Sequence, residues 1–401
     1  MKITKVSAFE VRSQVLKQPE NPRQRQVHPL DIYPRVTVRQ LPGQPEGEFR
    51  RRATYLEVRA DEGISGIFGP LGDPAGQIPA IKRDLVPLLI GRDPLSTNLI
   101  HDLMFRLDRH GRSGHFVTAI SAVDCALWDL KGKAWSKPVF ELLGGPTRDA
   151  VPAYASMLGY SVEPEEAASA ARNMVREGYR AQKWFFAYGP DYDGNSVGAR
   201  SVEEGIARNV DMASAVRDAV GKYYPLMFDA FMGWDLSYAV RMAKLLEPLD
   251  PAWLEEPLAP EHLEGFRRLH ESTSVPIATG EHVYGRWQTR EILAAGCVSV
   301  LQNDPEWTGG ISELSRICSL ASSYDVPVIA HGHGLLPALH VAASESPVTV
   351  PYVEYLVAHQ EAKQYFHSTV VSPQNGMVRM PELHGLGFEL DESKIESRLE
   401  L

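Results

Sequence analysis

The sequence has few cysteines and no long hydrophobic run. Its three cysteines, Cys125, Cys297 and Cys318, are far apart and form no CxxC pair. This spacing argues against a disulfide framework and is typical of reduced core thiols in a cytoplasmic protein. No apolar run approaches the length of a membrane span, and the first residues lack the apolar core of a secretion signal. We therefore expect a cytoplasmic protein without a membrane partner.

The sequence also has fewer basic residues than acidic ones. The chain has 41 Lys and Arg against 51 Asp and Glu, which gives a net charge of −10. Nucleic acids and anionic membranes need basic surfaces, so neither is an expected partner. A small anionic substrate is not excluded, because a bound metal ion reverses the sign of the charge locally. With 401 residues, 44% of them hydrophobic, the chain can form a sizeable core and two or three domains.

The first 150 residues show strands followed by helices. Residues 1–11 and 53–60 alternate between apolar and polar side chains, and residues 64–68 can pair back after a turn. Apolar residues then recur at helical spacing from 80 to 143, and Gly144 ends the pattern. These features predict an α+β domain. Residues 13–48 form a long loop whose most ordered part surrounds His28, although a single loop histidine is more often a solvated surface residue.

From residue 151 the pattern changes to alternating strands and helices. This alternation predicts a (β/α)₈-type TIM barrel over residues 151–366, modified toward (β/α)₇β because the last unit lacks a full helix. The longest insertion, residues 188–200, follows the second strand at the face where active-site loops belong. Residues 367–401 leave the pattern and are expected to pack back on the N-terminal capping domain. The predicted strands are 151–157, 180–186, 225–228, 252–254, 275–278, 298–302, 326–330 and 351–356.

Three equally spaced carboxylates follow apolar runs of strand type. Asp229, Glu255 and Glu281 are 26 residues apart, from 229 to 255 and from 255 to 281. About 26 residues make one strand, one helix and two short loops, so the three carboxylates should meet at the C-terminal ends of consecutive parallel strands. Taken singly, each is more simply explained as a helix cap or a surface acid. Together they predict a site for a hard divalent cation, which takes oxygen ligands.

The next strands add candidate acid–base groups. Asp304 ends the sixth predicted strand and His331 the seventh, so the carboxylate can orient the imidazole and raise its basicity. Glu354 holds the same place on the eighth strand, where a catalytic role and a structural hydrogen-bonding role are equally open. Lys183 ends the second strand and is either a functional cation or a lysine snorkelling at a strand edge. His282 follows Glu281 and is a candidate contact to the substrate or to the metal ligands.

Longer motifs around these residues resemble the enolase superfamily, in its mandelate-racemase-like branch. They are Ser121–Asp129, Leu142–Gly145, the three carboxylates, Asp304 to Gly310, and His331-Gly332. Within that branch, Lys183 to Pro190 and Trp253 to Glu256 are most similar to the motifs of L-rhamnonate dehydratases. One departure is Phe185, which stands where many members carry a second lysine that acts as a base. Another is His333, where those relatives tend to have small hydroxylated residues.

The resemblance implies a dehydratase acting on a sugar acid such as L-rhamnonate. Mg²⁺ on Asp229, Glu255 and Glu281 would stabilise charge, His331 with Asp304 would remove the C2 proton and protonate the C3 hydroxyl as it leaves, and the product would be a 2-keto-3-deoxy acid. Glu354 would assist at the substrate carboxylate. The resemblance also implies a homo-oligomer. An epimerase or racemase, a cycloisomerase, and a catalytically silent metal-binding relative remain the alternatives. The candidate substrate contacts are His28, Lys183, His282, Arg50 and Arg52.

Overall fold

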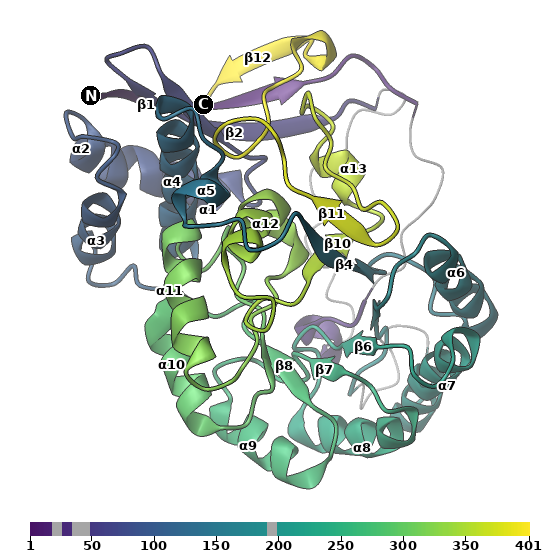
Figure 1. The fold of residues 1–401 in the computed structure, drawn as a ribbon. Coiled ribbons are helices and arrows are strands. Elements are labelled where there is room, and N and C mark those ends of the chain that lie inside the picture. Colours follow the sequence, from purple (N-terminus) through teal and green to yellow (C-terminus); the bar gives the residue numbers. More distant parts are fainter. Residues whose placement is uncertain (18–25, 34–48, 191–198) are drawn as a thin grey trace.

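Two sheets organise the chain. The computed structural model describes residues 1–17, 26–33, 49–190 and 199–401. An antiparallel sheet with its helices forms one part, and a curved parallel sheet with helices around its outside forms the other (Figure 1). Most of the two predicted active-site loops, 13–48 and 188–200, lies outside the described residues. Among the described residues, no helix combines the length and the apolar character needed to cross a membrane.

The N-terminal sheet pairs β1 (Ile3–Arg12), β2 (Arg52–Ala60) and β3 (Ser65–Phe68) in antiparallel order. Helix α4 (His115–Ala134) packs against β3 so closely that a Cβ at Gly66 would lie 2.0 Å from the carbonyl oxygen of Ala126. The stretch predicted to be helical from 80 to 143 is divided into several helices rather than one or two long ones. The helical elements here are η1 (Pro29–Ile32), α1 (Pro74–Ala80), the π-turn η2 (Ile81–Leu85), α2 (Val86–Leu89), α3 (Thr97–Leu107), α4 (His115–Ala134) and α5 (Val139–Leu142).

The parallel sheet follows the predicted strand order. Its strands are β4 (Ala150–Ser156), β5 (Gln182–Phe185), β6 (Leu226–Asp229), β7 (Trp253–Glu255), β8 (Ile277–Thr279), β9 (Val300–Leu301) and β10 (Val353–Leu356), with β10 beside β4. Most of these residues are buried, as expected for parallel strands covered by helices. The helices are α6 (Pro164–Arg176), α7 (Val202–Val220), α8 (Leu236–Leu246), α9 (Leu263–Ser272), α10 (Gly285–Ala295), α11 (Ile311–Ser322), α12 (Leu335–Ser344) and α13 (Gln360–Lys363), with the short turns η3 (Glu247–Leu249) and η4 (Gly332–Gly334).

One predicted strand is reduced to a single bridge. Residues 326–330 run beside β9, but only Val328 pairs, with Leu301. Pro327 has no N–H to donate to β9, so the bonds to β9 are those of Leu301 with Pro327 and of Ile329 with Leu301. The N–H of Val328 faces the other side and donates to the carbonyl of Thr349 at 2.8 Å. The segment still carries His331 to the end of the sheet, so the predicted modified barrel fold is confirmed although this strand is incomplete.

The C-terminal tail returns to both sheets. β11 (Met377–Arg379) pairs antiparallel with β4, and after the turn η5 (Glu392–Lys394) β12 (Ser397–Glu400) pairs antiparallel with β1. In Figure 1, β12, drawn in yellow, lies along the edge of the N-terminal sheet. The expectation that the tail completes the capping unit is therefore confirmed. The domain division at residue 150 stays a prediction.

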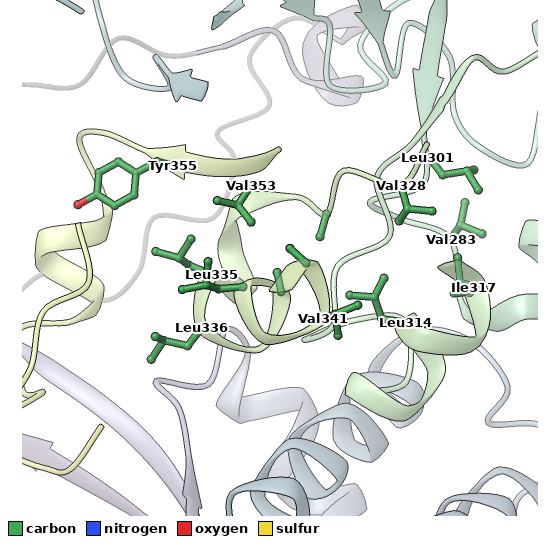
Figure 2. Packing of buried hydrophobic residues seen from close by; sticks show 14 of the residues in the cluster. Val283, Leu301, Leu314, Ile317, Val328, Leu335, Leu336, Val341, Val353 and Tyr355 are labelled. Carbon is green, nitrogen blue, oxygen red and sulfur yellow. The ribbon is translucent and has the colours of Figure 1, made fainter. Parts of the chain in front are cut away.

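The core beneath the last strands is continuous from helices to sheet. Figure 2 shows Leu314 and Ile317 of α11 and Leu335 of α12 among the side chains packed beside Val328 and Val353. All five are buried. This packing fixes the segments on either side of His331, so the candidate site rests on a rigid support.

Candidate metal and acid–base site

The three equally spaced carboxylates meet at one end of the parallel sheet. Asp229 ends β6, Glu255 ends β7, and Glu281 follows β8 by two residues. The register pairs Asp229 with Glu255 across the neighbouring strands. One oxygen of each carboxylate lies within 4.8 Å of the others, and the residues are 3%, 0% and 4% exposed. The explanation as surface acids is therefore wrong for this site, and the geometry could hold a metal ion.

Lysine 183 lies among these acids. Its Nζ is 3.4 Å from Asp229 Oδ2 and 3.0 Å from Glu354 Oε1, and it also contacts Glu255 Oε1. The residue is fully buried, so it does not snorkel at a strand edge. One ammonium group thus contacts three buried carboxylates, those of Asp229, Glu255 and Glu354, and Glu281 lies beside the first two. The excess of negative charge suits a divalent cation with oxygen ligands.

The pKa shifts show the same excess of charge. Burial, together with the charge of Glu255, raises the pKa of Asp229 well above its ordinary value. Burial also raises the pKa of Glu281 to about 7, against the opposing effect of two neighbouring histidines. These carboxylates resist ionisation together unless a cation lies between them. Glu354 behaves differently, because Lys183 and His331 outweigh burial and lower its pKa to about 2.

Hydrogen bonds fix Glu255 in one orientation. Its Oε2 accepts from Trp253 Nε1 at 3.1 Å and from the amide of Gln302, while Lys183 contacts Oε1. Trp253 comes from the same strand, and Gln302 directly follows β9. A ligand held in this way needs little reorganisation to bind an ion, since neighbouring donors set the ligand geometry in advance.

His331 and Asp304 form the predicted pair. The Nδ1 of His331 lies 3.2 Å from Asp304 Oδ2, and its Nε2 lies 3.6 Å from Glu281 Oε1. The Asp304 carboxylate also accepts the backbone N–H groups of Glu306 and Gly334 at 2.7 and 3.0 Å. Burial lowers the pKa of His331, but Glu281, Asp304 and Glu354 outweigh it and raise the pKa to about 10. The imidazole is thus directed at the carboxylate cluster by a fixed acid.

A stack of aromatic rings runs past His331. The ring of Trp307 lies 4.9 Å from His331, 5.2 Å from His333 and 5.8 Å from His282, measured between ring centroids. His282 pairs with Glu256 at 2.8 Å, and this contact outweighs burial and raises the pKa of His282 to about 9. Trp307 stands in a motif used for the family resemblance, but the sequence did not predict that its ring would contact these three histidines. Its place three residues after Asp304, at the strand ends, was the available signal.

His28 reaches the far end of this stack. Its ring lies 5.9 Å from that of Phe231, which lies 5.8 Å from His282. The Nδ1 of His28 accepts the N–H of Leu30 at 3.1 Å and so caps η1. The structure therefore brings His28 and His282 to the same side of the cluster through Phe231. Their roles as substrate contacts stay predictions, as do those of Lys183, Arg50 and Arg52.

A cavity of about 940 Å³ joins the acids to the N-terminal sheet. Asp229, Glu281 and His331 line it on the barrel side, together with Phe185. From the N-terminal part, residues 49–53 and 70–72 line it. Arg50 and Arg52 are therefore both at the cavity, as expected. Arg51 also lines it and was missed, because three consecutive arginines give no sequence signal for which side chains face inward.

Family comparisons cover both parts of the chain. The family described as Enolase C-terminal domain-like matches residues 166–394, and the N-terminal domain of Mandelate racemase / muconate lactonizing enzyme matches residues 47–144. The chain belongs to the mandelate racemase/muconate lactonizing enzyme family. The resemblance to the enolase superfamily that the sequence motifs indicated is thus confirmed.

Individual members of this family show how far the similarity extends. An L-rhamnonate dehydratase from Saccharopolyspora erythraea is 33% identical over 347 residues, covering 84% of this chain and 82% of the relative. A D-galactarolactone cycloisomerase from Agrobacterium fabrum is 31% identical over 358 residues, covering 86% and 90%. The crystal structure of a racemase from Streptomyces coelicolor A3(2) with bound magnesium has a TM-score of 0.77 at 26% identity and covers 100% of both chains. The family thus spans more than one reaction on a shared fold.

Proposed function

We propose that this protein is a Mg²⁺-dependent dehydratase of a sugar acid. The observation that carries the proposal is the one-sided acid–base arrangement. His331, held by Asp304, lies 3.6 Å from Glu281 at the carboxylate cluster, while the position that carries a second lysine in many relatives is Phe185. Racemisation needs an acid–base group of the protein on each face of the carbon. Dehydration needs only one such group when the C2 proton and the C3 hydroxyl of the substrate lie on the same face. The dehydratase among the relatives supports the same assignment.

Asp229, Glu255 and Glu281 would hold the Mg²⁺ ion. When bound there, the ion would stabilise the negative charge that develops on the substrate carboxylate as the C2 proton leaves. Lys183, which contacts three acids of the site, would help to orient a carboxylate oxygen of the substrate. Glu354, ionised beside Lys183, fixes the turn after His331 by accepting the N–H of Gly332 at 2.9 Å.

The proton balance then requires only His331. Its Nε2 takes the proton from C2, and the same proton goes to the C3 hydroxyl, which leaves as water. The product enol becomes a 2-keto-3-deoxy acid. A neutral imidazole is needed for the first step. Among the neighbours, the charge of Glu281 does most to raise the pKa of His331. With that charge offset by a bound cation, the pKa of His331 would lie closer to the range of a useful base.

A substrate screen tests this function. The purified protein with Mg²⁺ is incubated with a library of monoacid and diacid sugars, with 2-keto acid formation and NMR spectra as readouts. We expect a keto product from at least one acid, and we expect H331N to lower turnover at least about 10³-fold while Mg²⁺ binding persists. H384N, at an exposed histidine, is the matched control and should match the wild type.

Other outcomes would contradict the dehydratase assignment. An epimer without keto product would indicate an epimerase or racemase, and a rearranged lactone would indicate a cycloisomerase. Tight Mg²⁺ binding without any turnover would indicate a silent relative. Turnover retained in H331N would refute the role of His331. The proposal also includes a homo-oligomer, which sedimentation or light scattering can measure separately.

A further inference from the structure

The cationic side chains that line the cavity fall into two groups. Arg50 contacts Glu396 and lies 3.2 Å from the carbonyl oxygen of Ser13. Lys363 lies 3.6 Å from Glu306, which also contacts His333. These cations are neutralised by acids of the chain. Arg51 and Arg52 differ, because no carboxylate of the described residues pairs with either of them.

Arg51 is the better placed of these two. Its guanidinium carbon lies 5.8 Å from the centre of the Phe49 ring and 5.3 Å from that of Tyr365. Its Nε is buried and has no hydrogen-bond partner. Aromatic faces stabilise the cation, but they do not satisfy its N–H donors. Arg51 is half-buried, and of its guanidinium nitrogens Nε is the one that is buried without a partner. An anion at the guanidinium would satisfy this donor, and the planar fork matches a carboxylate or a phosphate.

The acids and the two arginines without a carboxylate partner reach the cavity from different parts of the fold. Asp229 and Glu281 are the only acids among the described residues that line it, and both belong to the proposed metal site. Arg51 and Arg52 line the same cavity from the N-terminal sheet. A substrate whose carboxylate is held at the metal site would extend its other end toward these arginines. A neutral hydroxymethyl end would leave the fork of Arg51 unpaired.

We propose that Arg51 binds a second anionic group at the distal end of the substrate, so that the preferred substrate is a dianionic sugar acid. The inference rests on the proposed function and refines its substrate class. Arg52, exposed on β2, supplies further positive charge at the same side. A terminal carboxylate and a terminal phosphate share this chemistry, and the two can be distinguished by experiment.

Binding and turnover are measured on matched sets of acids. Each set has a common configuration at the internal carbons and ends in a hydroxymethyl group, a carboxylate or a phosphate. Calorimetry in the presence of Mg²⁺ gives the dissociation constants for the wild type, R51Q, R51K and R172Q. Arg172 is exposed on α6 away from the cavity, so R172Q makes the same charge change as a control. R51K keeps the positive charge but lacks the planar fork, and circular dichroism checks that each variant folds.

The wild type should bind a dianionic acid at least about 10-fold more tightly than its hydroxymethyl counterpart. R51Q should weaken the dianion by about 10- to 100-fold and the monoanion by less than about 3-fold, with R51K in between and R172Q unchanged. Equal binding of all three ends, or equal weakening of them by R51Q, would overturn the inference. If R51Q does not fold, R51K decides by the same criterion. If binding prefers the dianion through Arg51 but no keto product forms, the inference is supported and the dehydratase function is refuted. If only the monoanion is turned over efficiently to a keto acid, the dehydratase function is supported and the inference is refuted.

Discussion

Two groups of buried acids in this molecule have different neighbours. At the strand ends, Lys183 contacts three buried carboxylates and Glu281 lies beside two of them, and the pKa values of Asp229 and Glu281 are strongly raised. Between α4 and the elements that cover it, Asp124 and Asp129 are also fully buried. Each of these two is paired mainly with N–H and hydroxyl donors. Carboxylates that lie close together repel one another and favour binding of a cation. Carboxylates that lie apart, each with its own hydrogen-bond donors, instead hold segments of the chain together.

The acids on α4 connect distant parts of the fold. Asp129 accepts the backbone N–H groups of Ile67 and Leu386, each at 2.8 Å, and Lys133 Nζ at 2.8 Å. Asp124 accepts the N–H and the hydroxyl of Ser312, at 2.9 and 2.6 Å, at the start of α11. One acid therefore joins α4 to the N-terminal sheet and the tail, and the other joins it to the barrel. Substitutions in the two regions should have different signatures.

The largest effect is expected at Lys183. K183M removes the only ammonium group that contacts the strand-end acids among the described residues. Without added metal at pH 8, the free energy of unfolding should fall by about 3–5 kcal/mol, because the remaining charges are buried and uncompensated. Mg²⁺ should restore part of the loss, since it takes over the neutralising role. Chemical denaturation with and without Mg²⁺ measures both the loss of stability and the part of it that Mg²⁺ restores.

The control for this variant is K244M, at an exposed lysine of α8. It should leave the free energy of unfolding within about 0.5 kcal/mol of the wild-type value. If K183M were as stable as the wild type in the absence of metal, the strand-end acids would not be crowded in the way described. A loss that Mg²⁺ does not change would show that the ion binds elsewhere.

A smaller effect, of a different kind, is expected at Asp129. D129A leaves the backbone N–H groups of Ile67 and Leu386 without their acceptor and Lys133 with only Glu389, 3.1 Å away. This should lower the free energy of unfolding by about 2–4 kcal/mol. Mg²⁺ affinity at low temperature should change less than about 3-fold, because Asp129 lies on α4 and not at the strand ends. Denaturation and metal titration together separate the two regions. A strong loss of Mg²⁺ affinity in folded D129A would contradict the distinction.

The strand-end region could be predicted from sequence because each acid is placed by local rules. An apolar run that ends in a carboxylate fixes that carboxylate at a strand end, and equal spacing places neighbouring strands side by side. The same reasoning placed Asp304 and His331 correctly, even though residues 326–330 form only a bridge. Lys183 was located on the right strand, but its contacts with three acids depend on side-chain packing that spacing does not encode.

The region around α4 could not be predicted in the same way. The sequence showed Asp124 and Asp129 as polar residues interspersed on an apolar helix stripe, which does not distinguish a solvated side from a buried one. Their burial follows from contacts with Leu386 and Ser312, which lie far along the chain. Arg51 is a similar case, since its contact with Tyr365 requires the C-terminal part of the chain to fold back.

The smallest effect is a pH dependence that arises at Asp124. Burial raises the pKa of Asp124 to about 7, against the hydrogen bonds from Ser312. Because the folded-state pKa lies above the unfolded value of about 3.9, its contribution to stability is complete below that value and is lost as the pH rises through about 7. Between pH 6 and pH 8 the free energy of unfolding should therefore fall by about 1–2 kcal/mol more in the wild type than in D124N. Since D124N also changes one hydrogen bond, the slope with pH is decisive and the absolute stability is not. Parallel slopes for the two proteins would mean that Asp124 is ionised throughout and that α4 joins the barrel through a charged carboxylate.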